Sequence, residues 1–249
     1  IYGYVTNGIF QSWDEVYADD TPTHQNMDPQ ERRNATARQG FTAPGDIRFK
    51  DLNGDGVINE DDRAYLGSPT PDFTYGFTAN LQYSNWDATI FLQGNYGNKI
   101  YNQTRNYVEN MRDYNNTSVR AFENHWTEDD PHNDVRFPRA IFNDPNGNIR
   151  ASDRWVEDGS YMRLKNLSVG YTLPQDLVAR AGMEQFRVYV SGQNLLTLTG
   201  YSGLDPEIGT NSGDAANNNI ANDGLFSRGY ADAAWPHPRR FETGVQVTF

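Results

Sequence analysis

The sequence of 249 residues contains no cysteine, which excludes disulfide frameworks, thiolate zinc sites and thiol nucleophiles. Lysine is scarce, with three lysines among the 21 basic residues. Acidic residues outnumber basic ones, and the net charge is -12. No basic stripe is present, so we expect no nucleic acid among the partners. No segment approaches the ~20 consecutive apolar residues that a membrane-spanning helix needs.

What remains is a polar chain that is rich in aromatic side chains. Hydrophobic residues make up 37% of it and aromatic residues 13%. Such a chain is too aromatic to be disordered and too polar to build a thick two-layer core. A transmembrane β-barrel fits this composition, because its strands alternate apolar and polar residues and need no continuous apolar run.

Five segments alternate with a period of two, which is typical of strands with two unlike faces. They are residues 73–84, 86–97, 161–173, 186–198 and 241–249. Their length of about 9–13 residues matches the ~9–11 that a tilted strand needs to cross a bilayer, whereas soluble strands average ~5–6. The pattern therefore favours an antiparallel transmembrane β-barrel over a soluble β-sandwich.

Short and long connections alternate between these segments. Ser84 and Asn85 form a two-residue turn and residues 174–185 a short connection, whereas residues 98–160 and 199–240 form long loops. Outer-membrane barrels alternate short periplasmic turns with long extracellular loops in the same way. The alternation places the long loops outside the cell.

Five strands cannot close a membrane barrel, and hydrocarbon does not tolerate an open sheet edge. We therefore expect a fragment whose missing strands come from another polypeptide or from the rest of a parent chain. Residues 73–249 are expected to supply the C-terminal strands, and residues 1–72 an extracellular loop region.

The alternation also predicts which side chains meet water and which meet lipid. Residues expected to wet the barrel interior are Thr74, Thr78, Asn80, Gln82, Asp87, Gln93 and Asn95. Residues expected to face lipid are Phe77, Leu81, Ile90 and Leu92. Tyr83 and Trp86 stand beside the short turn, where an aromatic girdle belongs.

Residues 51–62 have the spacing of a calcium-binding loop, with Gly56 at the sharp turn. The expected ligands are Asp51, Asn53, Asp55, the carbonyl of Val57, Asn59 and Asp62. Position twelve is Asp rather than Glu, and residues 46–50 alternate like a strand, so the loop resembles that of dockerin-type modules. The sequence predicts a structural Ca²⁺ here; the alternative is an Asn/Asp/Gly-rich turn without metal.

Aromatic residues outside the strands are the other candidates for binding. Four tryptophans are predicted to stack on a cargo molecule, or alternatively to pack the loops together: Trp13, Trp126, Trp155 and Trp235. Scattered histidines and neighbouring carboxylates provide no nucleophile, phosphate loop or zinc motif. The sequence therefore predicts a protein that is not an enzyme.

Several motifs together resemble the C-terminal part of SusC/RagA-like TonB-dependent outer-membrane transporters. They are residues 2–4, 8–11, 45–56, 66–76, 91–94, 156–167, 190–197 and 238–240, and the final strand that ends at Phe249. The likeness covers essentially the whole chain.

The resemblance implies a 22-stranded barrel in the bacterial outer membrane, with an N-terminal plug that TonB engages. It also implies a SusD-like lipoprotein lid and a cargo of oligosaccharides or oligopeptides. Phe249 is similar to the signal that the barrel-assembly machinery reads. The plug and the TonB-contacting segment lie outside this chain, so no energy-coupling residue is assigned.

Two other functions remain open at this point. One is a calcium-stabilised extracellular carbohydrate-binding or adhesion module, which would fold alone in buffer. The other is an outer-membrane enzyme, which would need loop carboxylates to converge on a substrate.

Overall fold

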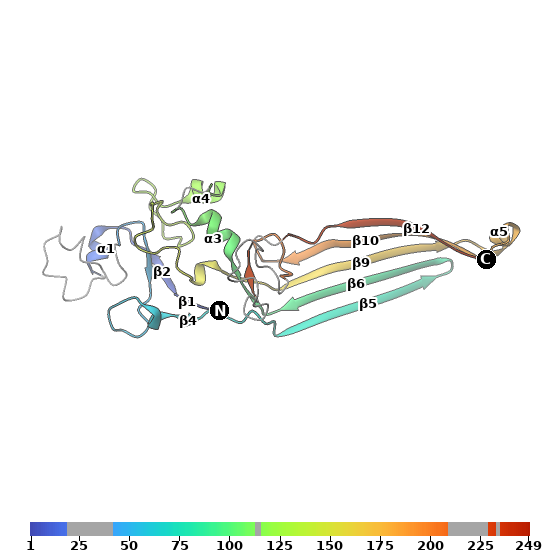
Figure 1. Ribbon diagram of the computed structural model, residues 1–249, viewed down its shortest axis with the longest axis horizontal. Coiled ribbons are helices and arrows are strands. Elements are labelled where there is room, and N and C mark those ends of the chain that lie inside the picture. Colours follow the sequence, from blue (N-terminus) through green and yellow to red (C-terminus); the bar gives the residue numbers. More distant parts are fainter. Residues whose placement is uncertain (19–41, 113–115, 209–228, 233–234) are drawn as a thin grey trace, which may run out of the picture.

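A computed structural model describes residues 1–18, 42–112, 116–208, 229–232 and 235–249. They form one long antiparallel sheet and a region of short elements that lies at one end of it (Figure 1). We call that end of the sheet the loop end. The opposite end, where the C-terminus lies, is the turn end (Figure 1).

The long sheet has five strands in the order β12-β10-β9-β6-β5, and all neighbours are antiparallel. The strands are β5 (Phe73–Tyr83), β6 (Trp86–Tyr96), β9 (Tyr161–Thr172), β10 (Gln185–Thr199) and β12 (Arg240–Thr248). All five segments predicted from the alternation are strands, and their bounds agree with the prediction to within one residue.

The register places the alternating residues on two consistent faces. Phe77 lies opposite Leu92, and Ile90 lies opposite both Ala79 and Leu167. These residues define the apolar face of the sheet. The opposite face is polar, although it includes Phe91, which pairs with Thr78 and Asn166.

Two connections close the turn end. Ser84 adopts a φ of 52° in the two-residue turn between β5 and β6, and the side-chain amide of Asn85 donates a hydrogen bond of 2.8 Å to the carbonyl of Thr172. Between β9 and β10 lie a short helix, α5 (Gln175–Val178), and a 3-10 turn, η3 (Ala179–Ala181). The hydrogen bond from Asn85 to Thr172 ties the β5–β6 hairpin to the end of β9.

Short elements fill the region beyond the loop end of the sheet. β1 (Tyr2–Gly3) pairs with β4 (Ala64–Tyr65), β2 (Thr6–Ile9) with β3 (Ile47–Phe49), and β7 (Lys99–Asn102) with both β8 (Val156–Asp158) and β11 (Tyr230–Ala231). The helical elements are α1 (Trp13–Ala18), η1 (Glu60–Asp62), α3 (Gln103–Glu109), α4 (Val119–Asn124) and η2 (Asp153–Trp155). No helix among the described residues is both long and apolar enough to cross a membrane.

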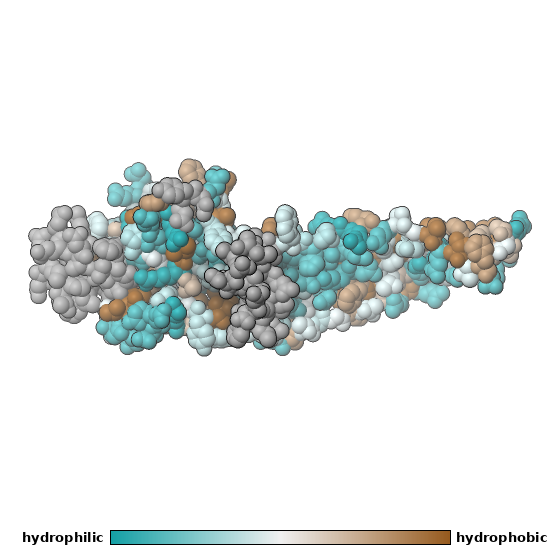
Figure 2. All heavy atoms as spheres, viewed as in Figure 1, coloured by the Kyte–Doolittle hydropathy of each residue, from teal (hydrophilic) through white to brown (hydrophobic). Residues whose placement is uncertain are grey.

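Fully buried side chains of the described chain lie in this loop-end region rather than on the sheet. Phe10, Ile47, Ile100 and Trp155 belong to its interior. The apolar face of the sheet, in contrast, leaves residues such as Phe77 and Leu81 exposed. The surface view shows hydrophilic side chains over the loop-end part of the sheet and hydrophobic ones near its turn end (Figure 2). The sheet therefore has no core of its own within the described chain.

Candidate functional site

The polar face of the sheet carries a charged pair that crosses three strands. Arg187 on β10 donates hydrogen bonds to both carboxylate oxygens of Asp87 on β6, at 2.8 and 2.5 Å. Gly170 on the intervening β9 has no side chain, and a Cβ there would collide with the guanidinium of Arg187. The glycine therefore lets the pair pass directly over the strand between them.

A second charged group lies on the same face near the loop end. Arg163 on β9 donates to Asp205 and to Glu207, and Lys165 donates to Glu207 at 2.8 and 2.6 Å. His237 donates its backbone N–H to Asp205 at 2.9 Å. These five residues, the loop-end charge cluster, tie both ends of the connection between β10 and β12 to the polar face of β9.

Asp205 is the centre of this cluster. Burial alone would raise the pKa of its carboxyl group, but hydrogen bonds from Arg163 and from the amides of His237 and Glu207 lower that pKa to about 2. Asp205, Glu207 and His237 lie close enough together to share a metal ion. Because Arg163 and Lys165 already neutralise the two carboxylates, the cluster is an ion-pair network rather than a metal site.

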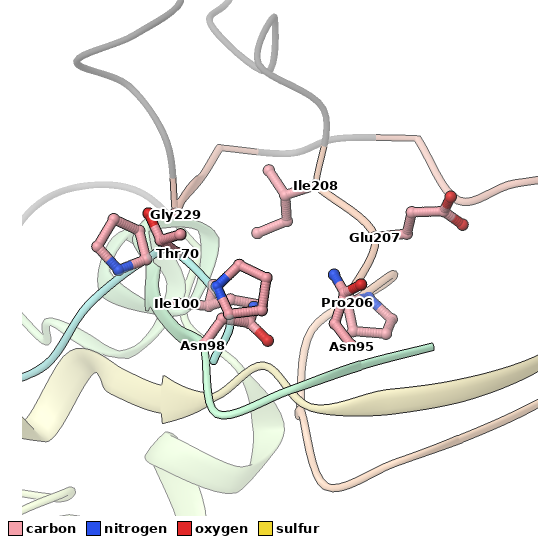
Figure 3. Close-up of a pocket in the computed structure, with 10 residues that line it drawn as sticks. Thr70, Asn95, Asn98, Ile100, Pro206, Glu207, Ile208 and Gly229 are labelled. Carbon is pink, nitrogen blue, oxygen red and sulfur yellow. The ribbon is translucent and has the colours of Figure 1, made fainter. Parts of the chain in front are cut away.

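A cavity of about 190 Å³ opens beside this cluster, where the polar face meets the loop-end region (Figure 3). Its wall includes Asn95 near the end of β6, Asn98 just before β7, Ile100 in β7 and the loop that carries Glu207. Three prolines and two isoleucines line it together with two asparagines, Thr70, Glu207 and Gly229. The cavity is thus half apolar and half polar.

The predicted calcium loop is tightly curled by its own hydrogen bonds. Asp51 accepts hydrogen bonds from the amides of Gly54 and Gly56, at 2.7 and 2.9 Å. Both glycines have a positive φ, which favours glycine at these positions. Ile58 is buried in a cluster with Tyr4, Ile47 and Phe49, so it anchors the loop to the loop-end region.

The expected ligands do not all point to one place. Asp62 is fully buried and accepts hydrogen bonds from the amides of Leu52 and Asn59, so it closes the base of the loop. Among the described residues, the carboxylates of Asp51, Asp55 and Asp62 do not gather closely enough to hold an ion together. The donors are nevertheless hard oxygens, the type that calcium prefers.

The four tryptophans divide into two groups. Trp155 is completely buried under the guanidinium of Arg154, at 3.9 Å from ring to cation, and the buried Trp126 donates its indole N–H to Gln11. Neither ring has an open face, so these two are core residues rather than candidates for stacking on a cargo molecule. Trp13 is partly exposed and stacks on Tyr17, and Trp235 is 92% exposed.

Aromatic residues mark both ends of the apolar face. At the turn end Trp86 packs on Tyr171 with ring centroids 4.8 Å apart, and at the loop end Phe73 stacks on Tyr96 at 5.3 Å. The ten steps from Phe73 to Tyr83 span about 33 Å along β5 at ~3.3 Å per residue. A strand tilted by the usual ~35–45° would thus hold its aromatic bands about 25 Å apart across a membrane.

Comparisons with known proteins agree with this geometry, although no protein-family model matches the chain. The TonB-dependent receptor P3 of Formosa agariphila is 35% identical over 250 residues, and the alignment covers 100% of this chain and 22% of the receptor. The chain belongs to the SusC/RagA-like TonB-dependent receptor family. The receptor SusC of Bacteroides thetaiotaomicron is 28% identical over 66% of the chain. The chain spans about a fifth of the length of these receptors.

Solved structures show the fold of this part of such a receptor. The RagAB peptide importer in its closed-closed state matches with a TM-score of 0.66 at 22% identity, over 100% of this chain and 23% of that chain. A second structure, of the RagAB peptide transporter, gives a TM-score of 0.67 at 21% identity. The five-stranded sheet is therefore a partial barrel wall, as the alternation predicts.

Sequence reasoning missed the loop-end charge cluster of this receptor segment. Arg163 and Lys165 are basic residues within a predicted membrane strand, and charges in such a position need partners. That signal was present in the sequence. Their partners Asp205 and Glu207 lie about 40 residues further along the chain, and only the folded structure brings them together.

Proposed function

We propose that the chain is the C-terminal part of a TonB-dependent importer in the bacterial outer membrane. The observation that carries this proposal is the five-stranded sheet, with one apolar face bounded by aromatic bands and one polar face. In the described residues β5 and β12 each pair on one side only, which leaves two edges that hydrocarbon does not tolerate. Strands from the rest of the receptor would pair with both edges.

The proposed cargo is an oligosaccharide or an oligopeptide, taken up together with a SusD-like surface lipoprotein. Two similarities support this cargo. The relatives are named as TonB-dependent receptors, and the similar solved structures are of a peptide importer. TonB would act through the plug, in parts of the receptor outside this chain. The chemistry assigned to the chain is binding and gated passage, with no bond made or broken.

Structural calcium in the loop of residues 51–62 is a second element of the proposal. Asp51, Asn53 and Asp55 would hold the ion with the carbonyl of Val57 and with Asn59. The N–H of Val57 and the side chain of Asn53 lower the pKa of Asp55, which keeps this ligand charged. Asp62 would act chiefly by holding the loop closed from below.

Replacing Asp51 or Asp55 by alanine is expected to abolish calcium binding by the loop. Each substitution removes a charged oxygen donor, and charge count largely sets calcium affinity. Calorimetric titration of the purified full-length receptor with CaCl₂ measures the heat of binding. Asp61→Ala is the matched control, because Asp61 is an exposed acid of the same loop that is not an expected ligand. Equal heats from the Asp51, Asp55 and Asp61 variants would contradict the calcium assignment.

Affinity purification from native outer membranes tests the importer proposal. A tag would be added to this chain as the cell produces it, and everything retained after extraction in mild detergent would be analysed by mass spectrometry. We expect a plug-containing barrel and a SusD-like lipoprotein to be retained. Recovery of the chain alone, folded in buffer without detergent, would reject the importer and favour a calcium-stabilised binding module.

A further inference from the structure

We propose that Asn53 is a site of spontaneous covalent modification, at which the side-chain amide is lost and the residue becomes isoaspartate or aspartate. The site lies in the loop of residues 51–62 and follows from its geometry in the absence of metal. It depends neither on import nor on bound calcium.

The reaction joins the side chain of an asparagine to the peptide nitrogen that follows it. The Gly54 nitrogen loses its proton to hydroxide and attacks Cγ of Asn53. The N–Cγ bond forms, the Cγ–Nδ2 bond breaks, and ammonia leaves with a proton taken from water. A second water molecule opens the resulting succinimide ring at either carbonyl, so the net change is one water consumed and one ammonia released.

Glycine after the asparagine favours this ring closure, because it places no Cβ beside the attacking nitrogen. The sequence contains three such dipeptides, Asn7-Gly8, Asn53-Gly54 and Asn146-Gly147. Their covalent chemistry is the same, so the fold decides which of them reacts.

Asn53 and Gly54 are open to solvent. Both residues are exposed, and a Cβ placed on Gly54 would meet no atom within 4 Å. Hydroxide and water can therefore reach the Gly54 nitrogen, and the ring has room to form without displacing a neighbouring segment.

Hydrogen bonds within the loop favour the attack. The amide of Asp55 donates to Oδ1 of Asn53 at 2.9 Å, in a turn that folds the Asn53 side chain back along its own backbone. A side chain that is already folded back loses less freedom when the ring closes. The same N–H would stabilise the negative charge that Oδ1 gains during the attack.

The nucleophile and the leaving group also have suitable partners. The N–H of Gly54 donates to Oδ1 of Asp51 at 2.7 Å, and a hydrogen bond to a carboxylate polarises the N–H bond. The leaving Nδ2 of Asn53 donates to the exposed carboxylate of Asp55 at 2.9 Å. Water replaces an exposed partner of this kind at little cost.

Asn146 has the same dipeptide in a closed setting. It is 0% exposed, and its Nδ2 donates to the carbonyl of Ile47 at 3.2 Å and to Oδ1 of Asn148 at 2.8 Å. A Cβ on Gly147 would lie 2.7 Å from Nε of Arg150, so the arginine side chain covers this glycine. Asn146 can react only when this part of the loop-end region opens.

Asn7 is intermediate, because its side chain is exposed but its backbone belongs to β2. The side chain of Asn133 lies against Gly8, where a Cβ would collide with it. Oδ1 of Asn133 also accepts a hydrogen bond of 2.6 Å from the amide of Ile9. These contacts hold the Gly8 peptide in place and oppose ring closure.

Modification at Asn53 would change the shape of the loop. Isoaspartate adds one carbon atom to the main chain between residues 53 and 54, and either product adds a negative charge. The amides of Gly54 and Gly56 reach the carboxylate of Asp51 across this bond, so the longer main chain is expected to loosen both hydrogen bonds. The change accumulates with the age of the receptor, because neither hydrolysis product returns to asparagine.

The test is peptide mapping of the purified full-length receptor after incubation in mildly alkaline buffer with EDTA. Digestion at acidic pH prevents further reaction, and tandem mass spectrometry locates each asparagine that has become an acid. We expect Asn53 to convert, chiefly to isoaspartate, and Asn7 and Asn146 to react at least about tenfold more slowly, because they require local opening. Equal rates at Asn53 and Asn146 in the folded receptor would overturn the inference.

Two controls attribute the difference to the fold and to this residue. In urea all three dipeptides are expected to react at similar rates, and a preference for Asn53 that survives unfolding would overturn the structural explanation. Asn53→Gln keeps an amide but must close a larger ring, so its peptide is expected to stay unmodified. Conversion of that peptide at the same rate as in the parent receptor would place the reaction elsewhere and overturn the assignment.

The folded state of each sample is checked by its heat-modifiable form on semi-native gels. An Asn53 that stays intact in the folded receptor while it reacts in urea would also overturn the inference. The importer proposal is tested separately by its partners in native membranes, so either proposal can fail while the other stands.

Discussion

Replacing Arg139 by leucine is expected to destabilise the loop-end region by about 3–5 kcal/mol, the usual cost of leaving one partner of a buried ion pair alone. Arg139 donates two hydrogen bonds, at 2.8 and 2.9 Å, to the carboxylate of Asp46, which is 0% exposed. Hydrogen exchange of the full-length receptor measures the effect as a lower opening free energy for the amides of β3 and of residues 146–148.

The pH dependence of this variant follows from the same burial. Burial raises the pKa of Asp46 even with Arg139 present, and removing the guanidinium raises it further. A carboxyl group whose folded pKa lies above its unfolded value loses stability as the pH rises through the folded pKa. The Arg139→Leu defect is therefore expected to be larger at pH 8 than at pH 5.

Arg136→Leu is the matched control, three residues away. Arg136 pairs with Asp134 at the surface, where the two side chains are 48% and 35% exposed. Exposed pairs of this kind contribute about 0–1 kcal/mol. Similar losses of protection in the Arg136 and Arg139 variants would contradict the role given to the buried pair.

Replacing Gly94 by alanine is expected to impair folding of the barrel wall, at a cost of about 1–3 kcal/mol or more. Tyr75 lies over Gly94 from the opposite position on β5, and its hydroxyl donates to the carbonyl of Tyr161 at 3.2 Å. An added Cβ would collide with this carbonyl oxygen and with the Tyr75 ring. The measurement is the fraction of receptor in the folded, heat-modifiable form on semi-native gels of outer membranes.

Gly76→Ala makes the same change on the neighbouring strand. A Cβ at Gly76 would have its nearest neighbour at 3.5 Å, an ordinary contact. This variant is expected to fold like the parent receptor. Equal folding of the Gly94 and Gly76 variants would contradict the prediction that the close approach of Tyr75 requires glycine at position 94.

The alternation of side chains carried enough information to predict the strands of the wall. In β5, apolar residues such as Phe77 and Leu81 alternate with Thr78 and Asn80, and a period of two admits only one assignment of faces. The irregularity between β9 and β10 lies outside this rule, because Leu164 and Leu167 share a face although they are three residues apart, and alternation alone does not predict it. The strands and their faces depend on neighbours in sequence, which is why sequence alone could reveal them.

The interior of the loop-end region depends on contacts between distant segments. Asp46 bonds Arg139 and Asn148, which lie 93 and 102 residues away. Trp126 and Trp155 follow no periodic pattern, so the sequence did not distinguish rings that pack inside from rings that are open to a ligand. The same limit hid the cavity, since Asn98, Pro206 and Gly229 line it together only in the folded chain.

In a barrel wall, the polar face of the sheet meets water inside the barrel while the apolar face meets lipid. Because this chain contains no cysteine, single cysteines can be introduced at Phe77, Thr78, Asn80 and Leu81 and labelled with a nitroxide in the full-length receptor, with any cysteine elsewhere replaced. Relaxation by oxygen reports contact with lipid, and relaxation by a nickel chelate reports contact with water. We predict oxygen access at residues 77 and 81 and nickel access at residues 78 and 80. Nickel access at residues 77 and 81 in the folded receptor would contradict the barrel-wall assignment.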